Sequence, residues 1–413
     1  MVILYRLGRV LVVGLLFSLA TVTGCAHSKP NVPITGEEQH FIIERATASL
    51  DSLPVTVTAE VCERSAGSLN DFYSEGDYWW PDPDNPEGPY IRRDGETNPD
   101  NFTFHRLAMI RLSQIVGMQT SAYLLTGEQK FADGVAKHLD AWFVNPDTRM
   151  NPSMNYAQAI KGRVTGRGIG IIDAIHLIEV ARSVELLSKN SVLPERIRVG
   201  TIAWFNDFVT WLTTHPYGID EMNTKNNHAT CWVMQVGAFA RLTDNAEVME
   251  LCRKRFKEVL LPDQMAEDGS FPLELERTKP YGYSLFNLDA MFTTAEILSD
   301  ESNDLYAYTT TDGKSLLSGA EFLYPYVKDK SSWPYGEDVM YWDEWPVRHP
   351  FLLFAGRAYN KPEYIQLWEV LDGYPESQEV IRNMPIRNPL VWVIEKPIRW
   401  IRQDVRSVSF KLN

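Results

Sequence analysis

The sequence is poor in cysteine, and its cysteines do not follow the spacing of a disulfide scaffold or a zinc site. Only four occur among 413 residues, and none belongs to a CxxC pair. Cys25 ends an N-terminal apolar segment, which leaves Cys62, Cys231 and Cys252 for the folded body. One disulfide could form among these three, but we expect buried free thiols.

Positive charge is also in deficit. The sequence holds 40 Lys and Arg against 54 Asp and Glu, which gives a formal net charge of -14. Nucleic-acid-binding proteins normally present a basic face, so we expect no nucleic-acid partner. There is no HExxH motif, and His176, on an apolar helix, could at most be half of a metal-binding pair. We therefore expect no metal site.

Long apolar runs are absent after the N-terminal segment. The run VLVVGLLFSLATV follows Arg6 and Arg9 and fits an export signal. It ends in VTGC, which resembles the signal of a bacterial lipoprotein, in which Cys25 would be lipidated and become the first mature residue. An ordinary cleaved signal is the alternative. We expect a signal peptide at 1–24 and an exported protein, periplasmic or held at the outer membrane only by this lipid anchor.

Strand-like alternation is scarce, and most of the sequence indicates helices joined by long loops. Apolar residues recur at three- and four-residue intervals in NFTFHRLAMIRLSQIVGMQTSAYLLTG and in GIGIIDAIHLIEVARSVELLSK. The segment RIRVGTIAWFNDFVTWLTT follows the same rule, with Trp204 and Trp211 on its apolar side. Further helices are expected over 228–242, 244–259, 284–299 and 314–327.

Two segments share a layout that predicts a repeating architecture. In SAYLLTGEQKFADGVAKHLDAWF and GAFARLTDNAEVMELCRKRFKEVL, a helix end leads through Leu-Thr and a polar turn into a second helix. Helical hairpins of this size stack into arrays. We predict an all-α protein, an α/α toroid or incomplete barrel of helical hairpins with aromatic-rich loops. It would form a single domain over 41–413 after a linker at 25–40. An open superhelical stack is the alternative.

Two loops have an unusual composition. GDYWWPDPDNPEGPYIRRDGETNPDN and SSWPYGEDVMYWDEWPVRHP combine aromatic, proline and acidic residues and cannot be helical. Long ordered loops of this kind usually carry function. Because aromatic rings suit the apolar faces of sugars, we expect Trp79 or Trp80 to contact a sugar. A tryptophan that plugs the end of the helical barrel is the alternative.

Basic residues gather at four loop–helix junctions, in MNYAQAIKGRVTGRG, TKNNHATCW, ELERTKPYGYSLFNL and WPVRHP. In so acidic a chain, this grouping indicates a site for a carboxylate-bearing ligand. Simple pairing of Arg277 with Glu274 or Glu276 is the structural alternative. The basic residues are Lys161, Arg163, Arg167, Lys225, Arg277, Lys279 and Arg348.

The segment NNHATCW, followed after a helical hairpin by DGSFPLELERTKPYGYSLFNL, resembles the alginate lyase superfamily of polysaccharide lyases. The family pattern is Asn-Asn-His at the start of an inner helix, then Glu-Leu-x-Arg, then a tyrosine. YWWPDP and GRVTGRGIGIID also resemble this family, and the resemblance runs from about residue 55 to beyond residue 350. It implies an α/α toroid that cleaves a uronate polymer by β-elimination without a cofactor. The matching residues are Asn226, Asn227, His228, Arg277 and Tyr283 or Tyr281.

The resemblance also implies a role for each residue. Removal of the C5 proton of a uronate builds negative charge on the neighbouring carboxylate, and Asn227 and Arg277 would stabilise that charge. His228 would be the neutral base, and Tyr283 would protonate the glycosidic oxygen, although a phenolate could serve as the base instead. Tyr283 is preferred to Tyr281 because its interval from Arg277 better fits the family.

The implied substrate is an anionic polysaccharide, a 1,4-linked polyuronate, with alginate as the first candidate and glucuronan as the second. The residues expected to bind it are Trp79, Trp80, Tyr156, Gln158, Lys161, Arg163, Arg167, Asn226, Tyr281, Arg348 and His349.

Two rival functions also fit the sequence. A glycoside hydrolase on a similar toroid would use paired carboxylates, and the abundant loop acids offer Asp82 or Asp84 facing Glu337, Asp338 or Asp343. A non-catalytic glycan-binding lipoprotein would keep the tryptophans but would not need a base and an acid. In a purely structural interpretation, Asn226 caps a helix and His228 is a core histidine with satisfied hydrogen bonds.

Overall fold

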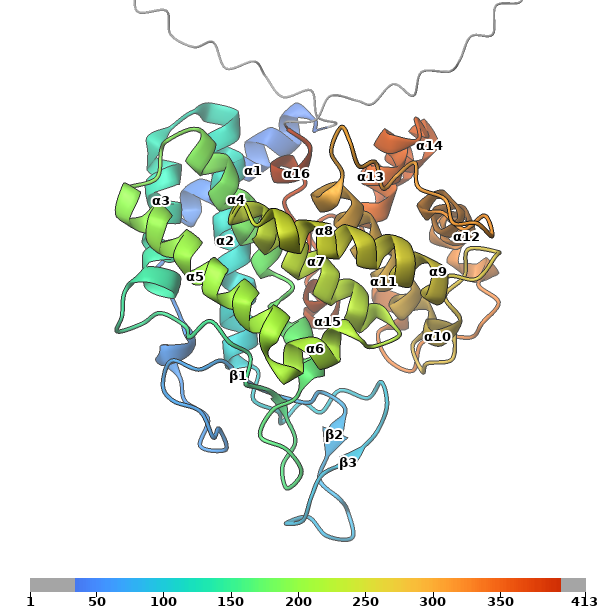
Figure 1. Cartoon of the computed structure of the whole chain (residues 1–413), viewed down its shortest axis with the longest axis horizontal. Coiled ribbons are helices and arrows are strands. Elements are labelled where there is room, and N and C mark those ends of the chain that lie inside the picture. The colour runs from blue at the N-terminus through green and yellow to red at the C-terminus, as the bar shows by residue number, and fades with distance from the viewer. Residues whose placement is uncertain (1–33, 395–413) are drawn as a thin grey trace, which may run out of the picture.

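The computed structural model describes residues 34–394, which fold mainly as helices joined by long loops (Figure 1). The first helix begins inside the segment expected to be a linker, because Thr35 caps it by accepting a hydrogen bond from the Glu38 backbone N–H. The expected signal peptide and Cys25 lie outside the described residues. The α-helices are α1 (Gly36–Ala48), α2 (Phe104–Thr126), α3 (Gln129–Leu139), α4 (Leu177–Lys189), α5 (Glu195–Thr214), α6 (Pro216–Met222), α7 (Asn227–Leu242), α8 (Ala246–Arg255), α9 (Leu261–Gln264), α10 (Pro272–Leu275), α11 (Pro280–Leu298), α12 (Leu316–Lys328), α13 (Pro350–Ala358), α14 (Pro362–Val370), α15 (Gln378–Arg382) and α16 (Leu390–Val393).

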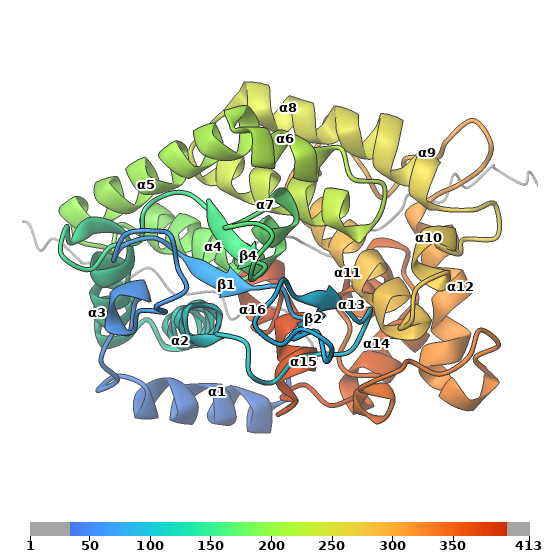
Figure 2. The same cartoon turned by 90° about the horizontal axis from the view of Figure 1, so that it is seen from below.

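The helices form two layers. In the inner layer, α2 packs on α4, α4 on α7, α7 on α11, and α11 on α13. Outer helices cover them, with α3 on α2, α5 and α8 on α7, α12 on α11, and α14 on α13. Helices α7 and α11 are buried along nearly their whole length, because neighbouring inner helices flank them and outer helices cover them (Figure 2). This arrangement confirms the predicted all-α class and α/α toroid architecture.

The two segments with a shared layout form equivalent hairpins, α2–α3 and α7–α8. Each hairpin runs directly into a π-helical turn, η2 (Asp140–Val144) after α3 and η4 (Phe256–Leu260) after α8. Such turns widen the helix by one residue and change the face that it presents. The first hairpin turns at Gly127, whose φ of 72° suits glycine.

The helix expected over GIGIIDAIHLIEVARSVELLSK is only partly α-helical. It begins with a 3-10 segment, η3 (Gly168–Ala174), and α4 follows from Leu177. Close packing explains the difference, since a Cβ on Gly170 would lie 2.6 Å from the backbone of Ala157. The segment therefore turns tightly beneath the loops instead of extending α4.

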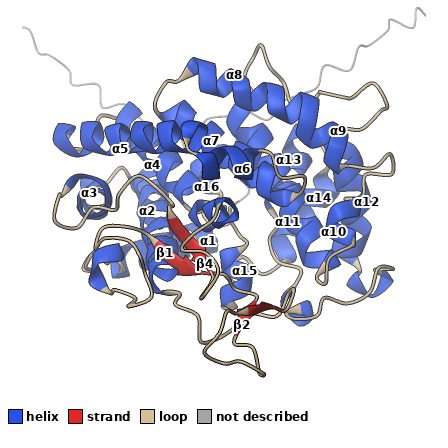
Figure 3. Ribbon diagram, turned by 60° about the horizontal axis from the view of Figure 1, so that its bottom comes forward, coloured by secondary structure: helices blue, strands red, loops and turns tan. Residues whose placement is uncertain are grey.

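Strands are few and short, and they lie at one end of the helices. β1 (Tyr73–Glu75) pairs in parallel with β4 (Tyr156–Ala159), and β2 (Trp79–Trp80) pairs in antiparallel with β3 (Ile91–Arg92). In Figure 1 the β2–β3 loop hangs below the helices, whereas α1 and α16 lie at the opposite end. Figure 3 shows the strands, in red, gathered at this loop end.

Among residues 34–394, no helix is long and apolar enough to cross a membrane. Cys62, Cys231 and Cys252 are buried free thiols, as expected. The remaining 3-10 segments of the described chain are η1 (Val57–Ala59), η5 (Lys330–Ser332) and η6 (Trp342–Glu344).

The sharp corner between α5 and α6 depends on a glycine. A Cβ on Gly218 would lie 2.0 Å from the Leu212 carbonyl oxygen, which belongs to rigid helix backbone. We expect Gly218→Ala to lower the free energy of unfolding by about 1–3 kcal/mol, measured by urea denaturation. Gly36→Ala is the matched control, because nothing lies within 4 Å of a Cβ there. Equal stability of the two variants would contradict this account of the corner.

Candidate active site

A cleft of about 280 Å³ opens at the loop end of the helices. Its walls come from the aromatic loop, η3, the start of α7, the α10–α11 junction and the end of α15. All four residues expected to carry the chemistry, Asn227, His228, Arg277 and Tyr283, line it. The other lining residues are Asp77, Tyr78, Trp79, Arg92, Gln158, Arg167, Ile169, Ile172, Thr224, Asn226, Phe286, Arg382 and Asn383.

Asn227 is held by a buried carboxylate at the start of α7. Its backbone N–H donates to Glu274 Oε1 at 2.7 Å, and its side-chain Nδ2 donates to Glu274 Oε2 at 2.8 Å. Burial raises the pKa of Glu274, and the two hydrogen bonds from Asn227 partly oppose that rise. Asn226, at the N-cap position, makes no side-chain capping bond. The helix-cap interpretation is therefore wrong, because Glu274 satisfies this helix end and Asn226 faces the cleft.

His228 lies between the cleft and the protein interior. Its Nδ1 is 2.8 Å from Oε1 of Glu221, a fully buried residue at the end of α6. The His228 side chain keeps 18% of its surface exposed, so it is not an enclosed core histidine. Burial raises the pKa of Glu221, and the neighbouring His228 counteracts part of that effect.

Arg277 is oriented by a carboxylate from the aromatic loop. Its Nη2 and Nε lie 3.0 and 3.2 Å from the Asp94 carboxylate oxygens, and Nη2 also donates to the Tyr283 hydroxyl at 3.3 Å. Burial raises the pKa of Asp94, but the hydrogen bonds and positive charges of Arg277 and Arg92 together keep it below its usual range. The Nη1 group has no hydrogen-bond partner among residues 34–394 and remains available to a ligand. Arg277 pairs with Asp94, so the structural alternative, in which it pairs with Glu274 or Glu276, is wrong.

Tyr283 forms a pair with a tyrosine that the sequence did not single out. The hydroxyl oxygens of Tyr283 and Tyr78 are 2.7 Å apart. Burial raises the pKa of Tyr283 well above its ordinary value, and Tyr78 adds to this, although Arg277 works in the opposite direction. The Tyr283 phenol therefore stays protonated near neutral pH. The Lys279 ammonium lies 5.1 Å from the Tyr78 ring and 5.4 Å from the Tyr283 ring.

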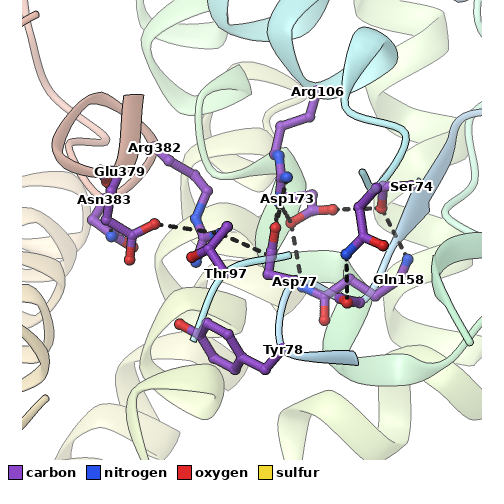
Figure 4. A network of polar contacts seen from close by, with 12 residues as sticks. Ser74, Asp77, Tyr78, Thr97, Arg106, Gln158, Asp173, Glu379, Arg382 and Asn383 are labelled. Carbon is purple, nitrogen blue, oxygen red and sulfur yellow. Dashed lines mark hydrogen bonds and ion pairs between the residues drawn. The ribbon is translucent and has the colours of Figure 1, made fainter. Parts of the chain in front are cut away.

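A buried network of charged groups, shown in Figure 4, includes Asp77 and Arg382 of the cleft lining. Both oxygens of Asp77 accept from Arg106, at 2.7 and 2.9 Å, and Arg382 lies 2.8 Å from Asp77 Oδ2. These two guanidinium groups outweigh burial and lower the pKa of Asp77. Lys279 Nζ lies 2.5 Å from Glu379 Oε1, which joins α11 to α15. These contacts fix the loop before β2, the start of α11 and the helix α15 to one another.

Trp79 lines the cleft, but its ring contacts arginines. The Arg163 and Arg167 guanidinium carbons lie 5.1 and 5.9 Å from its centroid. Trp80 lies outside the cleft, with its Nε1 donating to the Glu96 carbonyl at 2.9 Å and Arg93 over its ring. Trp79 therefore lies in the cleft beside two arginines, whereas Trp80 lies outside it, and sugar contact by Trp79 stays a prediction.

The other expected binding residues fall into two groups. Gln158, Arg167 and Asn226 line the cleft. Lys161 and Arg163 line a neighbouring open groove of about 670 Å³.

Four residues expected to bind the substrate serve the fold instead, so these four expectations are wrong. Tyr281 is fully buried, with its hydroxyl donating to the Tyr326 carbonyl, so it is also the wrong alternative to Tyr283. His349 is buried against Asp289 at 2.7 Å. Arg348 binds Glu38 at 2.7 Å, near α1. Tyr156 packs on the small cluster that contains Cys62 and Tyr73.

The carboxylates needed for a hydrolase do not gather in this cleft. Asp338 caps α11 by accepting hydrogen bonds from the Tyr281 and Gly282 backbone N–H groups, both at 2.9 Å. The cleft is lined neither by Asp338 nor by the other four acids considered for hydrolysis. His176 is buried beside Arg387. Among residues 34–394, no group of three or more His, Cys, Asp or Glu could hold a metal ion.

Sequence reasoning missed several residues that shape the cleft. Tyr78 stands in the quoted aromatic loop, and its place beside the two tryptophans was the only available signal. Glu221 lies one turn before Asn-Asn-His but in a separate short helix. Arg382 and Asn383 stand in the segment ESQEVIRNMP, which carries no motif.

Comparisons with known proteins agree with this arrangement. The family model described as alginate lyase matches residues 56–333. The crystal structure of an alginate lyase from Bacteroides ovatus is 31% identical, with a TM-score of 0.75, and the match covers 86% of this chain and 93% of that one. Among curated proteins, no significant match is found.

Alginate lyase A1-III is a more distant neighbour. Its complex with a tetrasaccharide has a TM-score of 0.54 at 15% identity, covering 87% of this chain and 94% of that one. The structure of A1-III from Sphingomonas species A1 has a TM-score of 0.50 at 17% identity, covering 86% and 95%. At these identities the likeness shows the shared α/α toroid fold. The family match over most of the chain shows more: the protein belongs to the alginate lyase family and is a polysaccharide lyase.

Proposed function

We propose that this lyase cleaves a 1,4-linked polyuronate by β-elimination in the cleft around His228, with alginate as the first candidate substrate and glucuronan as the second. One observation carries the proposal. An imidazole, a phenol, an amide and a guanidinium from distant parts of the chain line the same cleft. These four groups match the separate needs of the reaction: a base, an acid and two donors for the substrate carboxylate.

The chemistry follows from the contacts of each group. Asn227 and the free Nη1 of Arg277 donate hydrogen bonds to the uronate carboxylate, which stabilises the charge that develops when C5 loses its proton. His228 accepts that proton. The C5–H electron pair forms the C4–C5 double bond, and the C4–O bond breaks. Tyr283 then protonates the departing oxygen, and the raised pKa of its phenol supports this acid role.

Basic residues in the cleft and in the groove beside it support a polymeric anion as the substrate. Arg163 donates through Nε to the Tyr90 carbonyl at 2.6 Å, and no carboxylate within 4.0 Å of its guanidinium is found among the described residues. Arg167 binds the Gln158 backbone and side-chain oxygens at 3.0 and 2.9 Å, again without a carboxylate partner in residues 34–394. In a chain with a net charge of -14, cations without carboxylate partners attract an anionic chain locally.

We further propose that the protein is exported and anchored by a lipid on Cys25. The N-terminal Arg6 and Arg9, the apolar run and the VTGC ending support this proposal. A polymer too large to enter the cytoplasm would be cleaved outside it, so an exported enzyme suits such a substrate.

The acid role of Tyr283 predicts a large catalytic defect in Tyr283→Phe. We expect kcat to fall about 10²- to 10⁴-fold, because the departing oxygen loses its proton donor. The assay follows the near-ultraviolet absorbance of the unsaturated product on alginate and on glucuronan. Tyr281→Phe is the matched control, since within residues 34–394 that hydroxyl bonds only the Tyr326 carbonyl. A full rate in Tyr283→Phe, or an equal loss in both variants, would refute the assignment.

The Tyr78–Tyr283 pair predicts a shift in pH dependence. Burial raises the pKa of Tyr283, and Tyr78 raises it further. An acid catalyst must be protonated, so activity is lost as the pH rises through that pKa. Tyr78→Phe removes one raising influence, and we expect the alkaline limb of the kcat profile to move to lower pH. An unchanged or upward-shifted limb, measured with the same absorbance assay, would argue against the acid role of Tyr283.

A further inference from the structure

The His228 ring has a hydrogen-bond partner, Glu221, to which the reaction steps above give no role. Glu221 Oε1 lies 2.8 Å from Nδ1, and His228 also lines the cleft. Glu221 is fully buried, and its second oxygen, Oε2, has no hydrogen-bond partner among residues 34–394. A carboxylate withdrawn from water and bonded to a single ring nitrogen needs an explanation.

The position of Glu221 is fixed by packing. It lies in the last turn of α6, which packs against both η3 and α7. Its carbonyl oxygen accepts from the Thr224 backbone N–H at 3.2 Å and from the Thr224 hydroxyl at 2.8 Å. Gly218 keeps α6 close to α5. The carboxylate therefore holds one place relative to the start of α7, where His228 stands.

This contact selects one tautomer of the ring. An ionised carboxylate only accepts hydrogen bonds, so a 2.8 Å contact with Nδ1 requires the proton to be on Nδ1. Nε2 then carries the free electron pair and points away from Glu221, on the side of the cleft. The opposite tautomer would place a proton on Nε2 and leave the ring unable to accept one from a sugar.

Nearby charged groups also affect the ionisation of the Glu221–His228 pair. Burial opposes ionisation of Glu221, and Asp173 adds to that effect, whereas His228 and Arg167 favour the carboxylate. Glu274 also lies near the ring. Once Nε2 has taken a proton, the imidazolium and the buried Glu221 carboxylate neutralise each other.

We propose that Glu221 is a positioning residue for the elimination: it holds His228 with the proton on Nδ1, so that Nε2 can accept the C5 proton. The inference rests on the proposed function. In each turnover the C5 proton moves to Nε2, the C4–O bond breaks, and Tyr283 gives its proton to the oxygen. The proton on Nε2 then returns through solvent to the Tyr283 phenolate, which restores both groups.

The first test observes the tautomer directly and needs no substrate. Long-range proton–nitrogen correlation NMR on the full chain, labelled in histidine, distinguishes the two forms, and a His228→Gln variant identifies the signal. We expect the wild-type ring to carry its proton on Nδ1 and Glu221→Leu to lose this preference. A wild-type ring protonated on Nε2 would overturn the inference.

The second test separates positioning from folding. We expect kcat to fall about 10- to 100-fold in Glu221→Gln and further in Glu221→Leu, as for other partners that orient a reactive imidazole. KM should stay within about threefold, because the sugar contacts are intact. Glu179→Gln is the control, since Glu179 is equally buried but binds Asn388 at 3.0 Å outside the cleft. Its kcat per folded molecule, with the folded fraction measured by circular dichroism, should equal that of the wild type.

The two proposals fail in different ways. Wild-type kcat in folded Glu221→Leu would refute positioning while leaving the lyase reaction intact. Absence of any unsaturated product from the wild type would refute the proposed function, and the NMR experiment would still decide whether Glu221 fixes the tautomer.

Discussion

The arrangement of the cleft depends on the buried pairing of Asp77 with Arg106 and Arg382. A carboxylate without water needs such partners, and loss of one partner from a buried pair typically costs about 3–5 kcal/mol. The pairing fastens the loop before β2 to α2 and to α15. Since Tyr78 follows Asp77 directly, the same contacts bring its hydroxyl to Tyr283. A loop that looks independent in the sequence is thus part of the rigid body of the site.

One rule recurs around the cleft: buried or half-buried acids orient the groups that face the substrate. Glu274 holds Asn227, Glu221 holds His228, and Asp94 holds Arg277. The chain is acidic overall, yet these carboxylates point inward and leave donors and a base at the surface of the cleft. The acids orient the donors and the base of the cleft, which is how an acidic enzyme would bind the acidic polymer proposed as its substrate.

Much of the fold could be predicted from the sequence, because helical periodicity reports burial on one or both sides. The shared layout of two segments predicted equivalent hairpins, although not the π turn that ends each one. For the site, motif spacing correctly gathered His228, Arg277 and Tyr283 in one cleft. The prediction that His349 and Tyr281 bind substrate was wrong, because the polar atoms of both buried side chains bond other groups of the protein. Residues such as Arg382 could not be found, because only the tertiary fold brings α15 to the cleft.

The central claim is that this cleft breaks the glycosidic bond by elimination and not by hydrolysis. Mass spectrometry of the products formed from alginate or glucuronan in heavy-oxygen water tests it most directly. Elimination predicts fragments with an unsaturated end, lighter by one water molecule than hydrolysis products and without oxygen from the solvent. Fragments that carry one solvent oxygen, or an intact polymer after prolonged incubation with both substrates, would contradict the account.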